Sequence, residues 1–531
     1  MKISRTIYVI VAFVGLCIST SSVSGQRNLR LLSTYNVLNQ SLSGCWHFTD
    51  SSFHEYALIG AEQGIVFLDI TQPTNPVYLF QLPGNRSIWH EVKVRGNYAY
   101  AVSEGSDTNG IKNGVQIMDL RYLPDSVPFK FWQGDGAIAN QLLTAHTVTI
   151  DGDYLYINGH NINSLGKGVL ICSLADPWNP TYVGAVTGNY SHDSYVRSNR
   201  LYSSEIFAGQ FSVYDIANKA NPVLLATQST PSRFNHNTWL SDNGQVIFTT
   251  DERGGAPVAA YDISDLSNIT KLDEFKNINL PQSEVHNVRV IFDFVINPSY
   301  GSQLTIADAS RPHNIVEVAS YPTGPSLCWD ADPYLNSGAI LATDMTSHNV
   351  YLLEPTYKRA CYLEGIVTDS ITGAPLPGVS VAINATAGVK LTNADGSYAT
   401  GIVDTGTYSV TYSKLNYRTK TISGLSLQTS TVTLQNVELA PENISVPELN
   451  LNSFIQYGPN PTSGFIDITN LIGRPINLQL IDIHGRLVKT IHLQGDQGQV
   501  ERVLLNDIAP GIYHLQFLTE KGKATGKIVV N

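Results

Sequence analysis

The stretch HDSYVRSNRLYSSEIFAGQFSVYDIANKANPVLLATQS, residues 192–229, contains one complete unit of a repeat. A histidine opens two alternating apolar runs. A third run follows, which ends in a hydrophobic-Asp-hydrophobic step, and then come an Asn-Pro turn and a fourth run. Alternation at a period of two indicates half-buried strands, and Asn, Gly and Pro mark the turns between them. Each unit is therefore predicted to form four strands of one antiparallel sheet.

The unit recurs along the first two thirds of the chain. Six histidines open successive units at spacings of 43 to 56 residues, and Asp330 takes the seventh place. The histidines are His47, His90, His146, His192, His236 and His286. Four strands per unit at a period in the forties is typical of a β-propeller, and seven units predict seven blades.

The two ends of this region are predicted to pair. The last unit, residues 330–352, ends after its third strand, while residues 29–36 resemble the outer strands of the other units. A fourth strand supplied by residues 29–36 would close the ring and remove an exposed sheet edge.

Closure of the ring would gather the histidines on one face. The second strand of each unit runs back to that face, so the residues at the end of this strand are expected to lie beside the histidines. They are mostly acidic: Glu62, Glu104, His160, Glu205, Asp251, Glu252 and Asp344. The sequence thus predicts a second, largely acidic ring next to the first.

Three hypotheses for these rings stay open. The histidines could be structural, because buried polar groups must be hydrogen-bonded. A subset could instead bind a divalent transition metal, since imidazole and carboxylate are ligands for zinc, iron, manganese and copper. The predicted metal ligands are His90, His146, His192, His236, Glu104, Glu205 and Glu252. The third hypothesis is catalysis by a metal-bound water or a general base, as in a hydrolase or lyase. No local nucleophile, phosphate-loop or dinucleotide motif supports it.

The N-terminus predicts export. Lys2 and Arg5 precede an apolar run at residues 7–18 and small residues up to Gly25, which is the pattern of a signal peptide spanning residues 1–25. No other apolar segment is long enough to span a membrane, so the mature chain is predicted to have no transmembrane span. A net charge of −11 argues against a nucleic-acid partner.

An exported compartment permits disulfides. Cys45-Trp46-His47 and Cys328-Trp329-Asp330 share a local pattern in units that become neighbours when the ring closes. This predicts a Cys45–Cys328 bond, with two buried free thiols as the alternative.

The character of the sequence changes after residue 357. Residues 361–440 contain short alternating strands with GAPLPGV at 373–379 and NADGSY at 393–398. They resemble the carboxypeptidase regulatory-like domain, which implies a small β-sandwich with an accessory role and no peptidase activity. No His-Glu-x-x-His motif occurs in the chain. A linker is predicted at residues 441–452.

Residues 453–531 form the last unit. YGPNPTSG at 457–464, DIHGRLV at 482–488 and the final KIVV at 527–530 resemble the type A sorting domain of the type IX secretion system of Bacteroidetes. The resemblance implies a second small β-sandwich, export through the type IX machinery, and then release or attachment at the cell surface.

The repeat region itself, residues 28–357, resembles the choice-of-anchor B family, whose repeats are also described as LVIVD repeats. WHEVKV at 89–94, AHTV at 145–148 and VHNV at 285–288 carry this resemblance, with the Leu-Asp-Ile and Asn-Pro steps. It implies a fold and a surface location and leaves the chemistry open. We therefore expect an all-β protein, a seven-bladed β-propeller followed by two small β-sandwich domains, that binds a glycan or protein outside the cell. The alternative is a metal-dependent hydrolase or lyase at the channel mouth.

Overall fold

The computed structural model describes residues 26–301, 303–324, 326–442, 450–519 and 522–531. The predicted signal peptide and most of the predicted linker lie outside these residues. The described chain is all-β apart from four short helical turns: η1 (Leu120–Tyr122), η2 (Gly136–Ile138), η3 (Asn163–Leu165) and α1 (Leu451–Phe454). Within the described ranges, no helix has the length and apolar character needed to cross a membrane. The chain divides into two compact units, residues 1–415 with 419–440, and residues 416–418 with 441–531.

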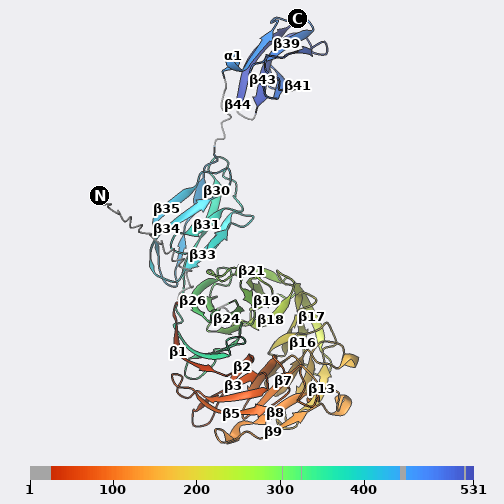
Figure 1. Ribbon diagram of the computed structural model, residues 1–531, viewed down its shortest axis with the longest axis vertical. Coiled ribbons are helices and arrows are strands. Elements are labelled where there is room, and N and C mark those ends of the chain that lie inside the picture. Colours follow the sequence, from red (N-terminus) through yellow and green to blue (C-terminus); the bar gives the residue numbers. More distant parts are fainter. Residues whose placement is uncertain (1–25, 302, 325, 443–449, 520–521) are drawn as a thin grey trace, which may run out of the picture. The chain divides into compact units, whose positions relative to one another are not determined.

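Seven antiparallel sheets make up most of the first unit (Figure 1). Sheet 1 contains β2 (Leu42–Thr49), β3 (Glu55–Ala61), β4 (Gly64–Asp69) and β5 (Val77–Pro83). Sheet 2 contains β6 (His90–Arg95), β7 (Tyr98–Ser103), β8 (Val115–Asp119) and β9 (Phe129–Trp132). Sheet 3 contains β10 (Thr147–Asp151), β11 (Tyr154–Asn158), β12 (Leu170–Ser173) and β13 (Thr181–Ala185). Sheet 4 contains β14 (Asp193–Arg197), β15 (Arg200–Glu205), β16 (Gln210–Asp215) and β17 (Val223–Ser229).

The remaining three sheets vary this plan. Sheet 5 contains β18 (Asn235–Leu240), β19 (Val246–Asp251), β20 (Val258–Asp262) and β21 (Thr270–Phe275). Sheet 6 has a first strand in two pieces, β22 (Glu284–Val285) and β23 (Arg289–Ile291), followed by β24 (Phe294–Tyr300), β25 (Gln303–Asp308) and β26 (Val316–Pro322). Sheet 7 contains β27 (Cys328–Asp332), β28 (Ile340–Asp344), β29 (Asn349–Pro355) and, from the start of the chain, β1 (Leu29–Asn36).

The sheets follow one another in a ring. Strand β1 pairs antiparallel with β29, from Leu29 opposite Pro355 to Asn36 opposite Asn349, which confirms the predicted pairing of the two ends. The first strands contact one another in order around the ring, β2 with β6, β6 with β10, β10 with β14, β14 with β18, β18 with β23, and β27 with β2, while between sheets 6 and 7 it is the second strand, β24, that contacts β27. They therefore surround a common axis.

The aspartate of the hydrophobic-Asp-hydrophobic step accepts a hydrogen bond from the backbone of the turn that follows it. The carboxylate of Asp69 accepts a hydrogen bond from Thr71 N at 2.9 Å, and Asp215 and Asp262 each accept from the backbone two residues on at 2.8 Å. This side-chain turn ends the third strand of these three sheets and starts the connection to the fourth. The apolar neighbours Leu68 and Ile70 are fully buried between sheets.

Residues 361–440 form two further sheets in the same unit. One contains β33 (Ser397–Ile402), β30 (Cys361–Asp369), β36 (Val432–Leu434) and β37 (Val437–Leu439); the other contains β32 (Val389–Leu391), β31 (Ser380–Ile383), β34 (Gly406–Ser413) and β35 (Lys420–Leu427). They are fastened to sheet 6, because Tyr362 Oη donates to Asp308 Oδ2 at 2.7 Å and Arg311 pairs with Glu364 at 3.0 Å.

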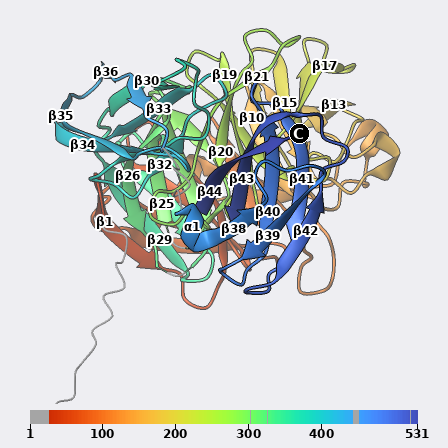
Figure 2. The same cartoon turned by 90° about the horizontal axis from the view of Figure 1, so that it is seen from above.

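The second unit also has two sheets. The smaller contains β38 (Ile455–Gly458), β39 (Phe465–Asn470) and β42 (Val500–Leu504). The larger contains β41 (Leu487–Leu493), β40 (Ile476–Asp482), β43 (Gly511–Thr519) and β44 (Gly522–Val530), which can be followed in Figure 2. Alternate residues of these strands, including Leu478, Leu480, Leu515 and Phe517, are fully buried and form a core of their own.

Candidate functional site

The pairing of the first two strands of each sheet determines which side chain reaches the mouth of the ring. In sheet 5, Asn235 pairs with Asp251 and Asn237 with Thr250, so His236 lies in a β-bulge. A bulge re-aims the side chain of its extra residue. The imidazole of His236 consequently lies against the imidazoles of the neighbouring sheets, with its ring tilted relative to theirs.

Sheet 7 has the same bulge at Trp329, between Cys328 and Asp330. Its indole lies 4.5 Å from the ring of His286, centroid to centroid. Trp329 therefore occupies the seventh ring position, and the prediction that Asp330 occupies it is wrong by one residue.

Sheet 1 also departs from the predicted register. The bulge lies between Leu42 and Cys45, and the hydroxyl of Ser43 accepts a hydrogen bond from His90 N at 2.9 Å. His47 lies further along the strand, where its Nδ1 is 2.7 Å from Asp332 Oδ2. The prediction that His47 belongs to the ring is therefore wrong, and Ser43 takes its place.

Four imidazoles lie next to one another around the mouth, with their rings tilted. The ring centroids are 4.1 Å apart between His146 and His192, 4.3 Å between His192 and His236, and 4.1 Å between His236 and His286. His90 joins three of them in lining a cavity of about 20 Å³. This volume suits a single water molecule or ion.

Hydrogen bonds select the tautomer of two of these histidines. Nδ1 of His286 is 2.6 Å from the carbonyl oxygen of Trp329. A carbonyl only accepts, so Nδ1 carries the proton of the neutral ring and Nε2 keeps its lone pair. Nδ1 of His146 is likewise 2.8 Å from Glu104 Oε1. This arrangement is the one that orients metal-binding imidazoles.

Nε2 of His286 is buried and has no hydrogen-bond partner within the part of the chain that the structure describes. Backbone hydrogen bonds reach the other buried imidazoles, from Asn85 and Ser87 to His90, from His236 to His192, and from His286 to His236. An unsatisfied buried polar atom costs roughly 1–3 kcal/mol. A purely structural role predicts that Nε2 of His286 is satisfied, so this atom favours a bound group.

Burial keeps the imidazoles neutral. It lowers the pKa of His90 to about 4 and holds the pKa values of His192, His236 and His286 well below the usual range. Neighbouring imidazoles lower the pKa values of the last three further, because two adjacent positive charges repel. Neutral imidazole is the form that binds metals.

Glu252 forms a group of three potential metal ligands with His236 and His286. Its Oε2 lies 4.0 Å from His236 Nε2 and its Oε1 lies 3.8 Å from His286 Nε2. Among the described residues, these three side chains form the one metal-ligand group whose donor atoms all lie within 4.8 Å of one another. Burial and the nearby Glu284 raise the pKa of Glu252 to about 7. Two imidazoles and one carboxylate are a common ligand set for zinc and iron.

The other predicted ligands lie elsewhere or act as partners. Glu104 Oε1 lies 2.8 Å from His146 Nδ1, and that hydrogen bond lowers the pKa of Glu104. Glu205 is buried and accepts hydrogen bonds from Asn189 and Gln210, both at 2.8 Å, so the structure does not bring it to the imidazoles. His286 was not among the predicted metal ligands, although it belongs to the same repeat as the predicted ones.

The predicted acidic ring is discontinuous. Glu62 pairs with Arg86, Asp251 accepts from the backbone of Phe234, and Asp344 accepts from the backbone of Ser347. His160 accepts from Ile162 N at 3.2 Å. Only Glu104 and Glu252, of the residues predicted for this ring, contact ring histidines through a carboxylate. The other carboxylates of the predicted ring accept hydrogen bonds from other groups, Glu62 from Arg86, Glu205 from Asn189 and Gln210, and Asp251 and Asp344 from backbone.

Exposed aromatic residues surround the mouth. Trp89 precedes His90 and is 38% exposed, and Phe207 is 75% exposed. The Phe207 ring stacks on Tyr190 at 5.1 Å, and Tyr190 lies 6.4 Å from His192. Large exposed aromatic side chains beside a concave site commonly mark a binding surface. They occupy no repeated position, so the sequence pattern did not single them out.

A layer of buried charges lies behind the histidines. Arg289 pairs with Asp330 at 2.9 Å, Asn287 donates to the same carboxylate at 2.8 Å, and Lys93 pairs with Glu91. Each first strand carries a polar residue directly after its ring histidine, as at Glu91 and Asn287, and that sequence signal could have revealed this layer.

The cysteines of the described residues form no disulfide bond. All four in the described residues are buried free thiols: Cys45, Cys172, Cys328 and Cys361. Cys45 Sγ faces the carbonyl oxygen of Leu341 at 3.9 Å. The predicted Cys45–Cys328 disulfide is therefore not present, because the two residues occupy different positions of their strands.

Two parts of the chain match known families. Residues 362–440 match the carboxypeptidase regulatory-like domain, and residues 457–531 match the secretion system C-terminal sorting domain. The sorting domain shows that the protein is exported by the type IX secretion system and is secreted or held at the cell surface. The type IX machinery is therefore one of its partners. No curated protein matches the chain.

Solved structures provide distant likenesses. The β-propeller domain of Cps50 (Swd1) from Myceliophteria thermophila is 10% identical, covers 62% of this chain and 100% of its own, and has a TM-score of 0.45. A putative 6-phosphogluconolactonase from Bacteroides uniformis is 13% identical, covers 69% and 96%, and scores 0.44. The computationally designed protein Ika8 is 12% identical, covers 62% and 99%, and scores 0.41. Similarity at this level gives no information about the activity or the ligand of this chain.

Proposed function

We propose that the chain is an extracellular binding protein of the choice-of-anchor B family, in which a seven-bladed β-propeller binds its ligand at the histidine mouth. The propeller interpretation is supported by the cyclic contacts of the seven sheets and by the closing pair of β1 and β29. Residues 361–440 and 453–531, each with two sheets, are taken as two small β-sandwich modules.

The mouth binds a divalent transition metal through His236, His286 and Glu252. The observation that carries this proposal is the lone pair on Nε2 of His286. The carbonyl of Trp329 holds the proton on the other nitrogen, and Nε2 is buried within 3.8 Å of a carboxylate oxygen and has no hydrogen-bond partner among the described residues. Such an atom is satisfied by a cation shared with the carboxylate.

The bound ligand is a glycan or a protein that contacts the aromatic rim formed by Trp89, Tyr190 and Phe207. Aromatic rings provide a flat apolar surface at little cost in conformational entropy. The metal at the centre would contribute an open coordination position, and the rim would provide contact area.

Elemental analysis of the purified full chain tests the metal site. We expect close to one equivalent of zinc, iron or manganese, and its loss in a His286→Gln, Glu252→Gln variant. Glu62→Gln is the matched control, because Glu62 ends the same strand in its own sheet but pairs with Arg86. Metal-free wild-type protein after growth with added metal, or equal metal content in the double variant, would contradict the proposal.

A metal-dependent hydrolase or lyase is the second candidate function. It is favoured by the ligand count, since three protein ligands leave a position for a reactive water, as in catalytic zinc sites. Screening ester, phosphoester and glycoside substrates with the metal-loaded protein distinguishes the two functions. Turnover that disappears with the double variant would establish the enzyme, while metal binding without turnover favours the binding protein.

A further inference from the structure

Tyr300 lies at the histidine mouth, in a position of sheet 6 that corresponds to acidic residues of other sheets. It ends β24, where it pairs with Glu284 of β22. It follows His286 by 14 residues, and Glu104 follows His90 by the same number. Tyr300 therefore occupies the place in sheet 6 that Glu104 occupies in sheet 2.

The ring of Tyr300 packs against one of the three proposed metal ligands. It stacks on the imidazole of His286, with the ring centroids 4.6 Å apart and the planes inclined by 30°. It also lies 5.9 Å from the indole of Trp329, whose carbonyl oxygen is 2.6 Å from Nδ1 of the same imidazole. Tyr300 and Trp329 together fix the orientation of His286.

The hydroxyl of Tyr300 forms a hydrogen bond with the carboxylate of Glu252, a second proposed ligand. An ionised carboxylate only accepts, so the phenol is the donor. The imidazoles do not hold this carboxylate. Its oxygens lie 3.8 Å from Nε2 of His286 and 4.0 Å from Nε2 of His236, and both distances are longer than a hydrogen bond. The orientation of the Glu252 side chain thus depends on Tyr300.

We propose that Tyr300 is a positioning residue of the metal site, which holds Glu252 and His286 in the arrangement that a divalent cation requires. The inference rests on the metal site proposed above and adds a residue that contacts two of its three ligands. Hydrogen-bond partners behind metal ligands typically change the metal affinity by roughly 10–100-fold. Phenylalanine keeps the ring and lacks the hydroxyl, so Tyr300→Phe separates the hydrogen bond from the packing.

The zinc affinity of the purified full chain, measured by competition with a chromophoric chelator, tests this role. Tyr300→Phe is expected to weaken zinc binding by roughly 10–100-fold without changing the number of sites. Tyr321→Phe is the matched control, and it should bind zinc as the wild type does. It removes a hydroxyl from β26 of the same sheet, where the ring lies 5.9 Å from that of Tyr351. Fluorescence melting curves confirm that each variant is folded.

A double-mutant cycle shows whether Tyr300 acts through Glu252. In a Glu252→Gln background, Tyr300→Phe should cause little further loss of zinc affinity, because the carboxylate that the hydroxyl positions is absent. A role of Tyr300 in packing alone predicts the same loss in both backgrounds.

Equal zinc affinity of the wild type and Tyr300→Phe would overturn the positioning role and leave the metal site in place. So would an equal loss in Tyr321→Phe, or the full loss in the Glu252→Gln background. Absence of zinc binding by the wild type would instead contradict the metal site itself, and the role of Tyr300 with it.

Discussion

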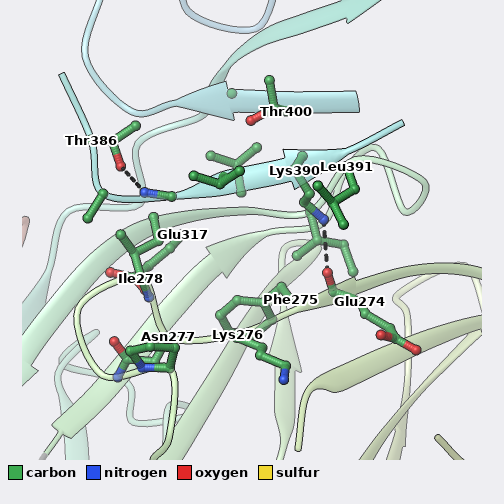
Figure 3. A pocket seen from close by; sticks show the side chains of 17 residues that line it. Glu274, Phe275, Lys276, Asn277, Ile278, Glu317, Thr386, Lys390, Leu391 and Thr400 are labelled. Atoms are coloured by element: carbon green, nitrogen blue, oxygen red, sulfur yellow. Dashed lines mark hydrogen bonds between the residues drawn. The ribbon is translucent and has the colours of Figure 1, made fainter. Parts of the chain in front are cut away.

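Replacement of Glu317 by Gln is expected to change how the stability of the ligand-free protein depends on pH. Glu317 is 3% exposed and lies in the wall of a cavity between sheets 5 and 6 and residues 386–401 (Figure 3). Burial raises the pKa of this carboxyl from 4.5 to about 7 in the folded chain. The unfolded chain has the ordinary value, so the folded state binds the proton more tightly. The stabilising contribution of the protonated form is complete below about pH 4.5 and is lost as the pH rises through 7.

The size of the expected change in the free energy of unfolding follows from the shift in the pKa of Glu317. A difference of about 2.5 pKa units corresponds to about 3 kcal/mol, as an upper bound for a carboxyl that relaxes little. The free energy of unfolding of the wild type should therefore fall, relative to Glu317→Gln, by up to about 3 kcal/mol between pH 4.5 and 7.5. Taking the difference between the two proteins removes the contribution of all other titrating groups.

Guanidinium unfolding followed by tryptophan fluorescence measures this difference. All six tryptophans lie between residues 46 and 329, so the signal reports on the seven sheets. Glu274→Gln should keep the wild-type pH dependence, because it leaves Glu317 in place. Wild-type and Glu317→Gln curves that remain parallel across this pH range would refute the inference that the Glu317 carboxyl is buried without a charge partner.

Three further outcomes are expected. Arg289→Met should lower the free energy of unfolding by roughly 3–5 kcal/mol, because it leaves Asp330 charged and buried, and denaturant titration measures this loss. Leu29→Ala should cost about 3 kcal/mol and lower the melting temperature, since Leu29 is 1% exposed in the strand that closes the ring. A thiol-reactive dye should label none of the cysteines in the folded, unreduced protein and all four after denaturation; labelling of only two would show a disulfide.

Repeat spacing and strand pattern predicted most of the first unit. The all-β class, four strands per unit and the pairing of residues 29–36 with the last sheet follow from alternation and turn residues, which act locally. The C-terminal modules were predicted from short motifs, and the matches at residues 362–440 and 457–531 confirm both families. The histidine mouth was predicted as a place where imidazoles meet, and the adjacent rings of His146, His192, His236 and His286 lie there.

The residues that make up the site could not be predicted from repeat spacing and strand pattern. A one-residue bulge moves a side chain from one position to the next, so Trp329 replaces Asp330 in the ring and Ser43 replaces His47. Each carboxylate accepts hydrogen bonds from the donors nearest to it. Glu205 accepts from Asn189 and does not contact the imidazoles, whereas Glu252 faces two of them.

The sequence by itself determined the strands, their order and the face on which the histidines gather, because these depend on periodicity and on turn chemistry along the chain. Tertiary structure alone decided the register, the tautomer of His286, the unpaired oxygen of Glu317 and the cavity beside it. Those features depend on atoms brought together from different sheets. Burial then decides which of these polar atoms are still without a partner.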